Sequence, residues 1–531
     1  EALQEYRYVE EPKPYKSKWA WIALTLGSYK IIMWIMGVHL LTFIVGGPPT
    51  TNVLLTVLLV VWIFFDNNVL NFIGPILFLW GFTKIFIIGS PKFQEVLARM
   101  VKFSGDLSVL STKNVRRSPA RTAAIAFLVA LIIGFGFQMI GSYASEQDYI
   151  FRQVRFDVGA DVSVEFEAVK NLTSTFDKIK GVPGISCAAV EYEFSGDPQA
   201  VDHETMHIKA VNPEEWLDAA YYEASSFGGR DVSSAFEELR RDNQTIILEH
   251  RLANVLGLTI GDEVAVKLYG SIATRTFSFK VVGFFGPKPP PASNPNYEWS
   301  WYWSYIHEDV YLSIMEEPYR RGRMLVKAAP DADDASIAEE IRNLQLTDVS
   351  SVYSFTESLN QWLKSPLAPQ TAQMFFEGIT VPTGLHQLGV VFAVLAASVG
   401  TALVTFVSLE ERRKEVGVMS VRGLSFGQIA KVLLCENLAV VGFAVLLGAA
   451  MGIVTLHGNL CAVSSTPTLF PRPTQQAWAS YTPIIHRMVF PSDSILTLAG
   501  CCILVLASAM IPTLFTTRRF IYEIERIVRE A

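Results

Sequence analysis

The stretch LEERRKEVGVMSVRGLSFGQI, residues 409–429, directly follows one long apolar segment and leads directly into another. It carries Arg412, Arg413 and Lys414, and Lys431 follows shortly after it. Short loops that are rich in lysine and arginine stay on the cytoplasmic side of a membrane. The stretch therefore predicts a cytoplasmic connection between two membrane-spanning helices, and it orients the rest of the chain.

The composition indicates a chain with membrane and water-soluble parts. The 531 residues are 50% hydrophobic and 18% charged, with a mean hydropathy of +0.29. Residues 142–385 hold roughly 36 acidic and roughly 20 basic side chains, so the remainder of the chain is net positive. A basic membrane part with an acidic insert is expected when the insert lies outside the cell. The acidic surface is explained by solubility, with cation binding as the alternative.

Hydropathy predicts six membrane spans, at residues 51–65, 69–88, 122–141, 388–409, 432–456 and 493–515. A seventh apolar stretch, 19–45, is interrupted by Lys30 and His39. An uninterrupted helix rarely places lysine at mid-depth, so we expect this stretch to lie in the interface or to dip into the membrane and return. If it crosses instead, the N-terminus lies outside.

The basic clusters then assign a side of the membrane to every segment. Three parts are expected to be cytoplasmic or interfacial: the N-terminal segment 1–50, the basic segment 91–121 and the connection 410–431. The tail 516–531 is also expected to be cytoplasmic. Segment 51–90 is a linking pair of spans, and core spans one to four are 122–141, 388–409, 432–456 and 493–515. The parts expected outside are the domain 142–387 and the loop 457–492.

The large external segment is predicted to be an α+β domain. DVGADVSVEF, residues 157–166, and TRTFSFKVVGFF, residues 274–285, alternate apolar and polar side chains as half-buried strands do. DDASIAEEIRNL, residues 333–344, has the acidic start of a helix. The predicted fold class is a membrane α-helical protein with a four-span core and two or three N-terminal hydrophobic helices. A large extracytoplasmic α+β domain is inserted between its first and second core spans.

No catalytic or metal-binding pattern emerges. The five cysteines have no metal-ligand spacing, and only Cys187 and Cys461 fall in segments expected outside, where they are candidates for a disulfide. Asn171 and Asn243 begin glycosylation tripeptides, which a host must be able to use. No Ser/His/Asp or H-E-x-x-H pattern links the scattered histidines, which include His203, His207, His250 and His307.

Small residues in two core spans predict close helix packing. Gly448 and Gly452 form a small-xxx-small face in GAAMG, and Ala396 and Gly400 offer another. Such a face serves either packing within the chain or dimerisation, and the pattern favours neither.

An aromatic run in the external segment is the other unusual feature. Its alternate residues share one face of a strand: Tyr297, Trp299, Trp301, Trp303 and Tyr305. Such a face is suited to binding a lipid, a sugar or a partner protein. Alternatively it packs on the core of its own domain or touches lipid headgroups.

This layout, together with the opening stretch, resembles the FtsX-like permeases of the MacB/LolC type, the type VII class of ABC transporter subunits. The resemblance rests on a motif after the second core span whose residues here are Glu411, Arg412, Glu415, Val416, Gly417, Val418, Met419, Gly423, Ser425, Gln428 and Ile429. Ser420 and Arg422 depart from it. Three further stretches agree with the family: NVRRSPARTA at 114–123, LEHRLANVLGLTIGDEVAV at 248–266 and MIPTLFTTRRFIYEIERIVRE at 510–530.

The resemblance implies a permease core whose cytoplasmic connection docks on an ATPase. The residues it assigns to this coupling are Glu411, Arg412, Arg413, Lys414, Glu415, Gly417, Gly423, Leu424, Ser425, Phe426 and Gln428. Gly423 is expected to permit a tight turn, with Leu424 and Phe426 exposed there and without a core of their own. The alternative is a solvated basic loop that only sets the topology. The chain has no G-x-x-x-x-G-K-[ST] loop, so ATP and Mg are expected on a separate ATPase dimer on the cytoplasmic side, and no cofactor on this chain.

The function implied is ATP-driven movement of the external domain, which exports or extracts a lipid, a lipoprotein or an amphiphilic peptide. The alternative is a signal transducer that moves no cargo and regulates an external partner, such as a cell-wall hydrolase. Longer family members carry two four-span units joined by two linking spans, and a chain beginning at Glu1 resembles the linker plus the second unit. Expected partners are that first unit or a second permease copy, an external substrate-binding or effector protein, and lipids of a prokaryotic plasma membrane, but no nucleic acid.

Overall fold

The computed structural model describes residues 18–38, 40, 52–88, 119–167, 172–200, 205–286, 303–364, 392, 394–395, 398–403, 405–407, 409–410, 416–419, 423–465 and 484–530. The chain forms two compact units. The first comprises Glu1–Glu146, Val381–Thr466 and His486–Ala531, and the second comprises Gln147–Thr380 and Pro467–Ile485.

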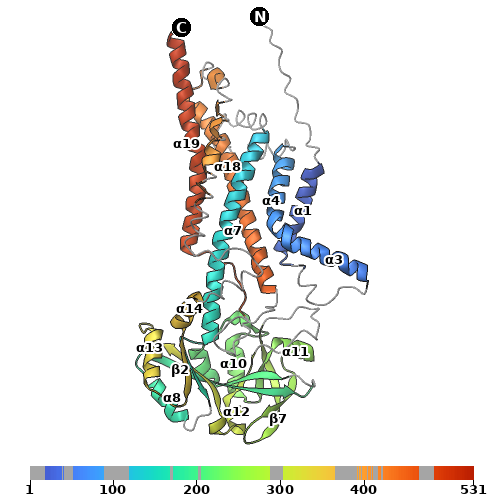
Figure 1. Cartoon of the computed structure of the whole chain (residues 1–531), viewed down its shortest axis with the longest axis vertical. Coiled ribbons are helices and arrows are strands. Elements are labelled where there is room, and N and C mark those ends of the chain that lie inside the picture. Colours follow the sequence, from blue (N-terminus) through green and yellow to red (C-terminus); the bar gives the residue numbers. More distant parts are fainter. Residues whose placement is uncertain are drawn as a thin grey trace. The chain divides into compact units, whose positions relative to one another are not determined.

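The first unit is built from long apolar helices (Figure 1). They are α1 (Lys18–Ile35), the run α3 (Val53–Phe65), η1 (Asp66–Leu70), α4 (Asn71–Phe82) and η2 (Thr83–Ile88), then α7 (Pro119–Val158), α18 (Phe426–Ser465) and α19 (Ser492–Glu530). Four stretches of the described residues are long and apolar enough to cross a membrane: Val53–Ile88, Thr122–Val158, Phe426–Ala462 and Ser492–Phe520. Within the fourth predicted segment, 388–409, the described residues include a shorter apolar helix, Ser398–Val407.

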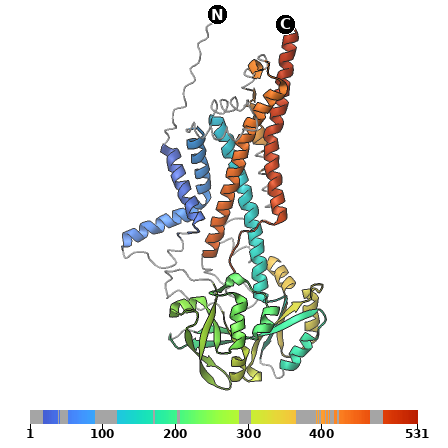
Figure 2. The ribbon, with the colours of Figure 1, turned by 180° about the vertical axis from the view of Figure 1, so that it is seen from behind.

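The predicted linking pair is helical over Val53–Ile88, with no break in the helix at residues 66–68. Whether this run crosses the membrane once or twice stays a prediction. The polar residues are accommodated by the π-helical turn η1, where Asp66 is buried against Lys30 of α1 and the Asn68 side chain donates to the Phe64 carbonyl. The chain changes direction at this turn, so α3 runs across the direction of α4 in both views (Figures 1 and 2).

Two small residues set the spacing of helices in this unit. At Gly81 of α4, an added Cβ would lie 2.7 Å from the Leu24 nitrogen of α1, so α1 and α4 pack backbone to backbone. Gly458 of α18 instead lies against a side chain, because a Cβ added there would lie 2.1 Å from the Trp34 ring of α1. The stretch predicted to lie in the interface or to cross is therefore helical over Lys18–Ile35 and packs on α4 and α18. Whether it spans the membrane stays a prediction.

The second unit is an α+β domain around one mixed sheet. Its strands are β1 (Val162–Glu167), β2 (Ile185–Pro198), β3 (Met206–Val211), β4 (Phe227–Gly228), β5 (Thr245–Glu249), β6 (Glu263–Tyr269), β7 (Thr274–Phe285), β8 (Trp303–His307), β9 (Arg321–Ala328) and β10 (Val349–Ser354). The strand order is β10-β1-β9-β2-β3-β8-β5-β7-β4, and β6 pairs with β2 and β7. β3–β8 and β5–β7 are parallel pairs, and the other pairs are antiparallel.

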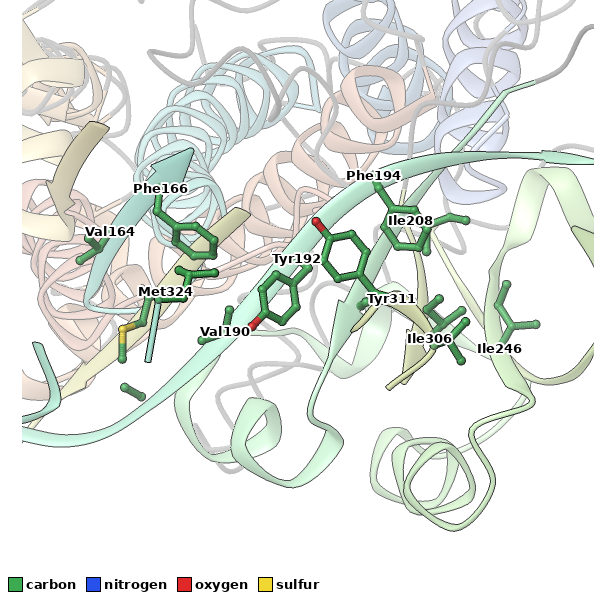
Figure 3. Packing of buried hydrophobic residues seen from close by; sticks show 14 of the residues in the cluster. Val164, Phe166, Val190, Tyr192, Phe194, Ile208, Ile246, Ile306, Tyr311 and Met324 are labelled. Carbon is green, nitrogen blue, oxygen red and sulfur yellow. The ribbon is translucent and has the colours of Figure 1, made fainter. Parts of the chain in front are cut away.

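Successive side chains of the strands point to opposite faces of the sheet, and apolar side chains lie on both faces. Helices therefore cover both faces. One core contains Val190, Tyr192 and Phe194 of β2, with side chains from α8 (Leu172–Lys180), α11 (His250–Leu256), α12 (Glu308–Ile314) and α13 (Asp334–Asn343) (Figure 3). The other core contains Ala189 of β2 with α9 (Pro213–Ala219) and α10 (Val232–Arg241), and Phe156 near the end of α7 packs against it. Helix α14 (Phe355–Lys364) follows β10. The predicted α+β fold class is confirmed.

Candidate functional site

The turn that follows the second core span is a helix N-terminus. Gly423 has a positive φ of 89°, a conformation that glycine adopts without a steric penalty. Helix α18 begins three residues later, at Phe426. A sharp change of direction therefore precedes α18 where the family motif has its glycine.

The motif residues Ser425 and Gln428 close this helix end. The Ser425 backbone N–H donates to the Gln428 side-chain Oε1 at 2.9 Å, and the Gln428 backbone N–H donates to Ser425 Oγ at 3.4 Å. This reciprocal pair is a capping box, which satisfies two N–H groups that have no partner within the helix. The spacing S-x-x-Q in the sequence therefore has a direct structural explanation.

A small cluster of buried hydrophobic residues packs against the turn. Its fully buried members are Leu409, Val416, Ile429, Leu433 and Phe520, and Met419 and Leu424 pack against it. Phe520 belongs to α19, so the cluster joins the start of α18 to a second long helix. The expectation that Leu424 lacks a core of its own is wrong, because Leu424 is half-buried against this cluster.

Among the described residues here, Phe426 at the turn and Val418 in the short helical stretch before it have exposed apolar side chains. Their exposed fractions are 42% and 53%. Gly417, between Val416 and Val418, lies in a short helical stretch and is half-buried. The charged residues Glu411, Arg412, Arg413, Lys414 and Glu415, as well as Ser420 and Arg422, lie outside the described residues. Their role in coupling stays a prediction.

The glycine face of α18 packs against α7 within the first unit. A Cβ added at Gly448 would lie 2.5 Å from the Ala130 carbonyl oxygen, and one added at Gly452 would lie 2.5 Å from the Gly134 carbonyl oxygen. Only a residue without a side chain lets two helix backbones come this close. Around Gly400 no described atom lies within 4 Å, and Ala396 is outside the described residues.

The aromatic face is only partly described. Tyr305 is 3% exposed and Trp303 is half-buried, because β8 is an interior strand between β3 and β5. Tyr305 packs on Trp216 and Phe285 in the second core of the sheet. Of the alternatives that the sequence left open for this face, Tyr305 follows packing on the core of its own domain. Tyr297, Trp299 and Trp301 lie outside the described residues.

The candidate modification positions remain predictions. Asn243 is exposed in the turn between α10 and β5, whereas Asn171 is not described. Cys187 and Cys461 are free thiols that belong to different units. Cys187 Sγ lies 3.4 Å from the Asp218 carbonyl oxygen, and Cys461 Sγ lies 3.6 Å from His457 Nε2.

Sequence reasoning missed an ion pair in the first unit. Lys30 Nζ of α1 lies 2.6 Å from Asp66 Oδ2 of η1, and their side chains are 3% and 5% exposed. The Lys30 ammonium also lies 5.7 Å from the centre of the Trp34 ring. Asp66 is the single acidic residue in 53–88, so the requirement that a buried charge be paired could have suggested this partner.

Sequence reasoning also missed a buried charged cluster in the second unit. Glu191 and Glu193 of β2 lie with Lys209 of β3 and Arg323 of β9 on the sheet face covered by α9 and α10. Burial alone would raise the pKa of Glu191, but the Arg323 guanidinium and the Lys209 ammonium lower it to about 2. Burial raises the pKa of Glu193 and lowers that of Lys209.

The two units together define a class of protein: a chain with apolar helices long enough to cross a membrane and an α+β domain inserted between them. Comparison with protein families gives two matches. Residues 122–344 match the MacB-like periplasmic core domain, and residues 388–522 match the C-terminal region of FtsX-like permeases. The chain belongs to the FtsX-like permeases of the MacB type, within the type VII ABC transporters, and the predicted family is confirmed. It is a transporter membrane subunit, and membership implies an ABC ATPase partner.

Two solved structures are similar to part of this chain. One is the periplasmic region of MacB from Actinobacillus actinomycetemcomitans, with 13% identity, coverage of 40% of this chain and 96% of that structure, and a TM-score of 0.26. The other is the extracellular domain of the noncanonic ABC-type transporter YknZ from Gram-positive bacteria, with 11% identity, coverage of 36% and 100%, and a TM-score of 0.23. The comparison with curated proteins returned no match.

Proposed function

We propose that this chain is the permease subunit of an ATP-driven transporter and that a separate ABC ATPase docks on the turn at Gly423. ATP and Mg are bound by that ATPase, and its closure moves the long helices and through them the external domain. The cargo is a lipid, a lipoprotein or an amphiphilic peptide, which the external domain extracts from the outer leaflet or expels.

The observation that supports this proposal is the exposed aromatic side chain of Phe426, which lies next to a packed hydrophobic cluster. Phe426 is the first residue of α18 and lies between the two residues of the capping box, and almost half of its side chain is exposed. Beneath it, Ile429 and Leu433 of α18 pack with Phe520 of α19. A partner that binds Phe426 and moves would therefore displace α18 and α19 together, because the residues next to the turn form a packed cluster between these two helices.

The proposal is tested by Phe426→Asp in the full chain. An aromatic anchor at the centre of an interface contributes about 2 kcal/mol, or roughly thirtyfold in binding. We expect the variant to insert in the membrane but to lose co-purification with the ATPase and stimulation of ATP hydrolysis. Gly423→Pro should have the same effect, because proline cannot adopt the positive φ of this turn.

Leu344→Asp is the matched control. Leu344 has an exposed fraction of 41%, close to that of Phe426, but it lies at the end of α13 in the other unit. It should keep full ATPase binding and stimulation. If Phe426→Asp binds and stimulates the ATPase as the control does, the turn is a topology signal alone and the coupling proposal fails.

A further inference from the structure

The end of helix α7 is held by an arginine from the middle of the sheet. Arg323 Nη1 of β9 donates to the carbonyl oxygens of Asp157 and Val158, at 2.8 and 3.3 Å. The last carbonyls of a helix have no partner within it, and a cation there also complements the helix dipole. Residues of α7 from Gln147 onward belong to the second unit, so this contact lies inside one compact body.

The same guanidinium is tied to the neighbouring strands. Arg323 Nε donates to Glu191 Oε2 of β2 at 2.6 Å. Glu191 also accepts from Lys209 Nζ of β3 at 2.7 Å and from Trp216 Nε1 of α9 at 2.6 Å. Because β9, β2 and β3 are adjacent, charge-assisted hydrogen bonds run from the helix end across three central strands.

The residues directly after α7 are held as well. Gly159 has a positive φ of 87°, and a Cβ added there would lie 2.8 Å from Arg323 Nη2. Its carbonyl oxygen accepts from the Tyr221 N–H at 2.6 Å. Asp161 accepts from Arg155 Nη2 of α7 at 2.8 Å and from the Ala328 N–H of β9 at 3.0 Å. These contacts therefore fix the conformation of the residues between α7 and β1.

Stability alone does not require these charges. The cluster is balanced, with two anions in Glu191 and Glu193 and two cations in Lys209 and Arg323. Apolar side chains of similar volume often stabilise a core as well as a buried ion pair does. Hydrogen bonds to a guanidinium add defined directions and distances, which apolar packing does not.

We infer that Arg323, Glu191 and Lys209 form a clamp that fixes the end of α7 to the central strands. When α7 rotates or shifts, the central strands therefore move together with its end. These are positioning residues. The clamp itself is independent of the proposed function, whereas its use in coupling rests on that function.

Arg323→Met in the full chain tests the clamp without any ATPase. Amide hydrogen exchange is the readout, because it resolves local opening from global unfolding. We expect protection to fall roughly tenfold or more at residues 157–161 and at Tyr221, while β5 and β7 keep theirs. Glu191→Gln, which keeps the side-chain shape, should give the same local pattern and serves if Arg323→Met does not fold.

Arg342→Met is the matched control. Like Arg323, Arg342 donates to a carboxylate and to the backbone, but its partners are Glu357 and the Val352 carbonyl oxygen rather than the end of α7. It should leave residues 157–161 protected. The clamp is overturned if Arg323→Met keeps full protection at 157–161, or if protection falls equally throughout the sheet.

The coupling role is tested in the complex with the ATPase. Addition of ATP should change exchange in β9, β2 and β3 of the wild type, but not in Arg323→Met. An equal response of the two proteins contradicts the inference. The failures are distinguishable, because Phe426→Asp tests docking alone and exchange without the ATPase tests the clamp alone.

Discussion

Single charged residues in apolar surroundings determine much of the geometry of this protein. Lys30 and Asp66 pair between two hydrophobic helices, and Glu191 joins Arg323 and Lys209 inside the external domain. In both places a buried charge is tolerated because a partner of opposite sign lies within hydrogen-bond distance.

The Lys30–Asp66 pair gives a first prediction. Lys30→Met leaves an unpaired buried carboxylate, which we expect to lower the stability of the full chain by roughly 3 kcal/mol or more. Lys30→Met combined with Asp66→Leu removes both charges and should recover most of that loss. Thermal unfolding in detergent measures both variants. Equal losses in the single and double variants would contradict a direct coupling of these two residues.

The pKa of Glu191 gives a second prediction. In the folded protein this pKa is about 2, below the value of 4.5 for an unperturbed glutamate. Its ionised form therefore contributes stability above about pH 4.5, by about 3 kcal/mol, and this contribution is lost as the pH falls toward 2. Glu193, whose pKa is raised by burial, acts in the opposite sense.

Comparison of the wild type with Glu191→Gln isolates the contribution of this one residue. The wild type should be the more stable protein at neutral pH, and the difference should shrink as the pH falls from 4.5 to 2. Unfolding midpoints of the two full-length proteins over this range provide the measurement. A difference that stays constant would show that Glu191 is not held ionised by its cations.

At the scale of elements, the helices of the first unit pack through small residues. Gly448 and Gly452 bring α18 against the backbone of α7, and Gly81 brings α4 against α1. A small-xxx-small face can serve packing within the chain or dimerisation. In the described structure the Gly448–Gly452 face packs within the chain. The sequence motif could not distinguish them, because a glycine face is the same whether its neighbour is α7 or a second copy.

Gly448→Leu is expected to separate α18 from α7, because its side chain would have to enter the space held by the Ala130 carbonyl. Gly442→Leu in the same helix is the control, since no described atom lies within 4 Å of its added Cβ. The Gly448 variant should lower the unfolding midpoint and the yield of folded protein, and the control should not. Similar losses in both variants would mean that leucine is disfavoured along α18 for reasons other than packing.

At the scale of the whole molecule, the external domain and the basic turn are predicted on opposite sides of the membrane. Asn243→Cys and Arg413→Cys, each in a chain without its five native cysteines, test this orientation. An impermeant thiol reagent added to intact cells should label the first and not the second, because basic loops stay inside. Labelling of both positions would overturn the orientation.

Local patterns in the sequence were sufficient for the fold class, the family and the turn at Gly423. Hydropathy, charge and strand alternation are properties of neighbouring residues, so they predicted the apolar helices and the α+β insert. A tight turn was expected at Gly423, which has a positive φ, whereas the capping pair of Ser425 and Gln428 was not predicted. The predicted span 122–141 gives no helix end, and α7 continues to Val158, where Arg323 of β9 bonds its last carbonyl oxygens.

The tertiary structure alone decided which distant residues meet. Lys30 and Asp66 are 36 positions apart, and Arg323 and Glu191 are 132 positions apart. No local period relates such residues, since their contact depends on strand order and on which helices cover each face of the sheet. For the same reason Leu424, which was expected to be exposed, is half-buried, and Tyr305, for which the sequence left two alternatives open, is buried. Hydropathy is local and determined the elements, whereas the pairing of buried charges is non-local and was decided only when those elements packed.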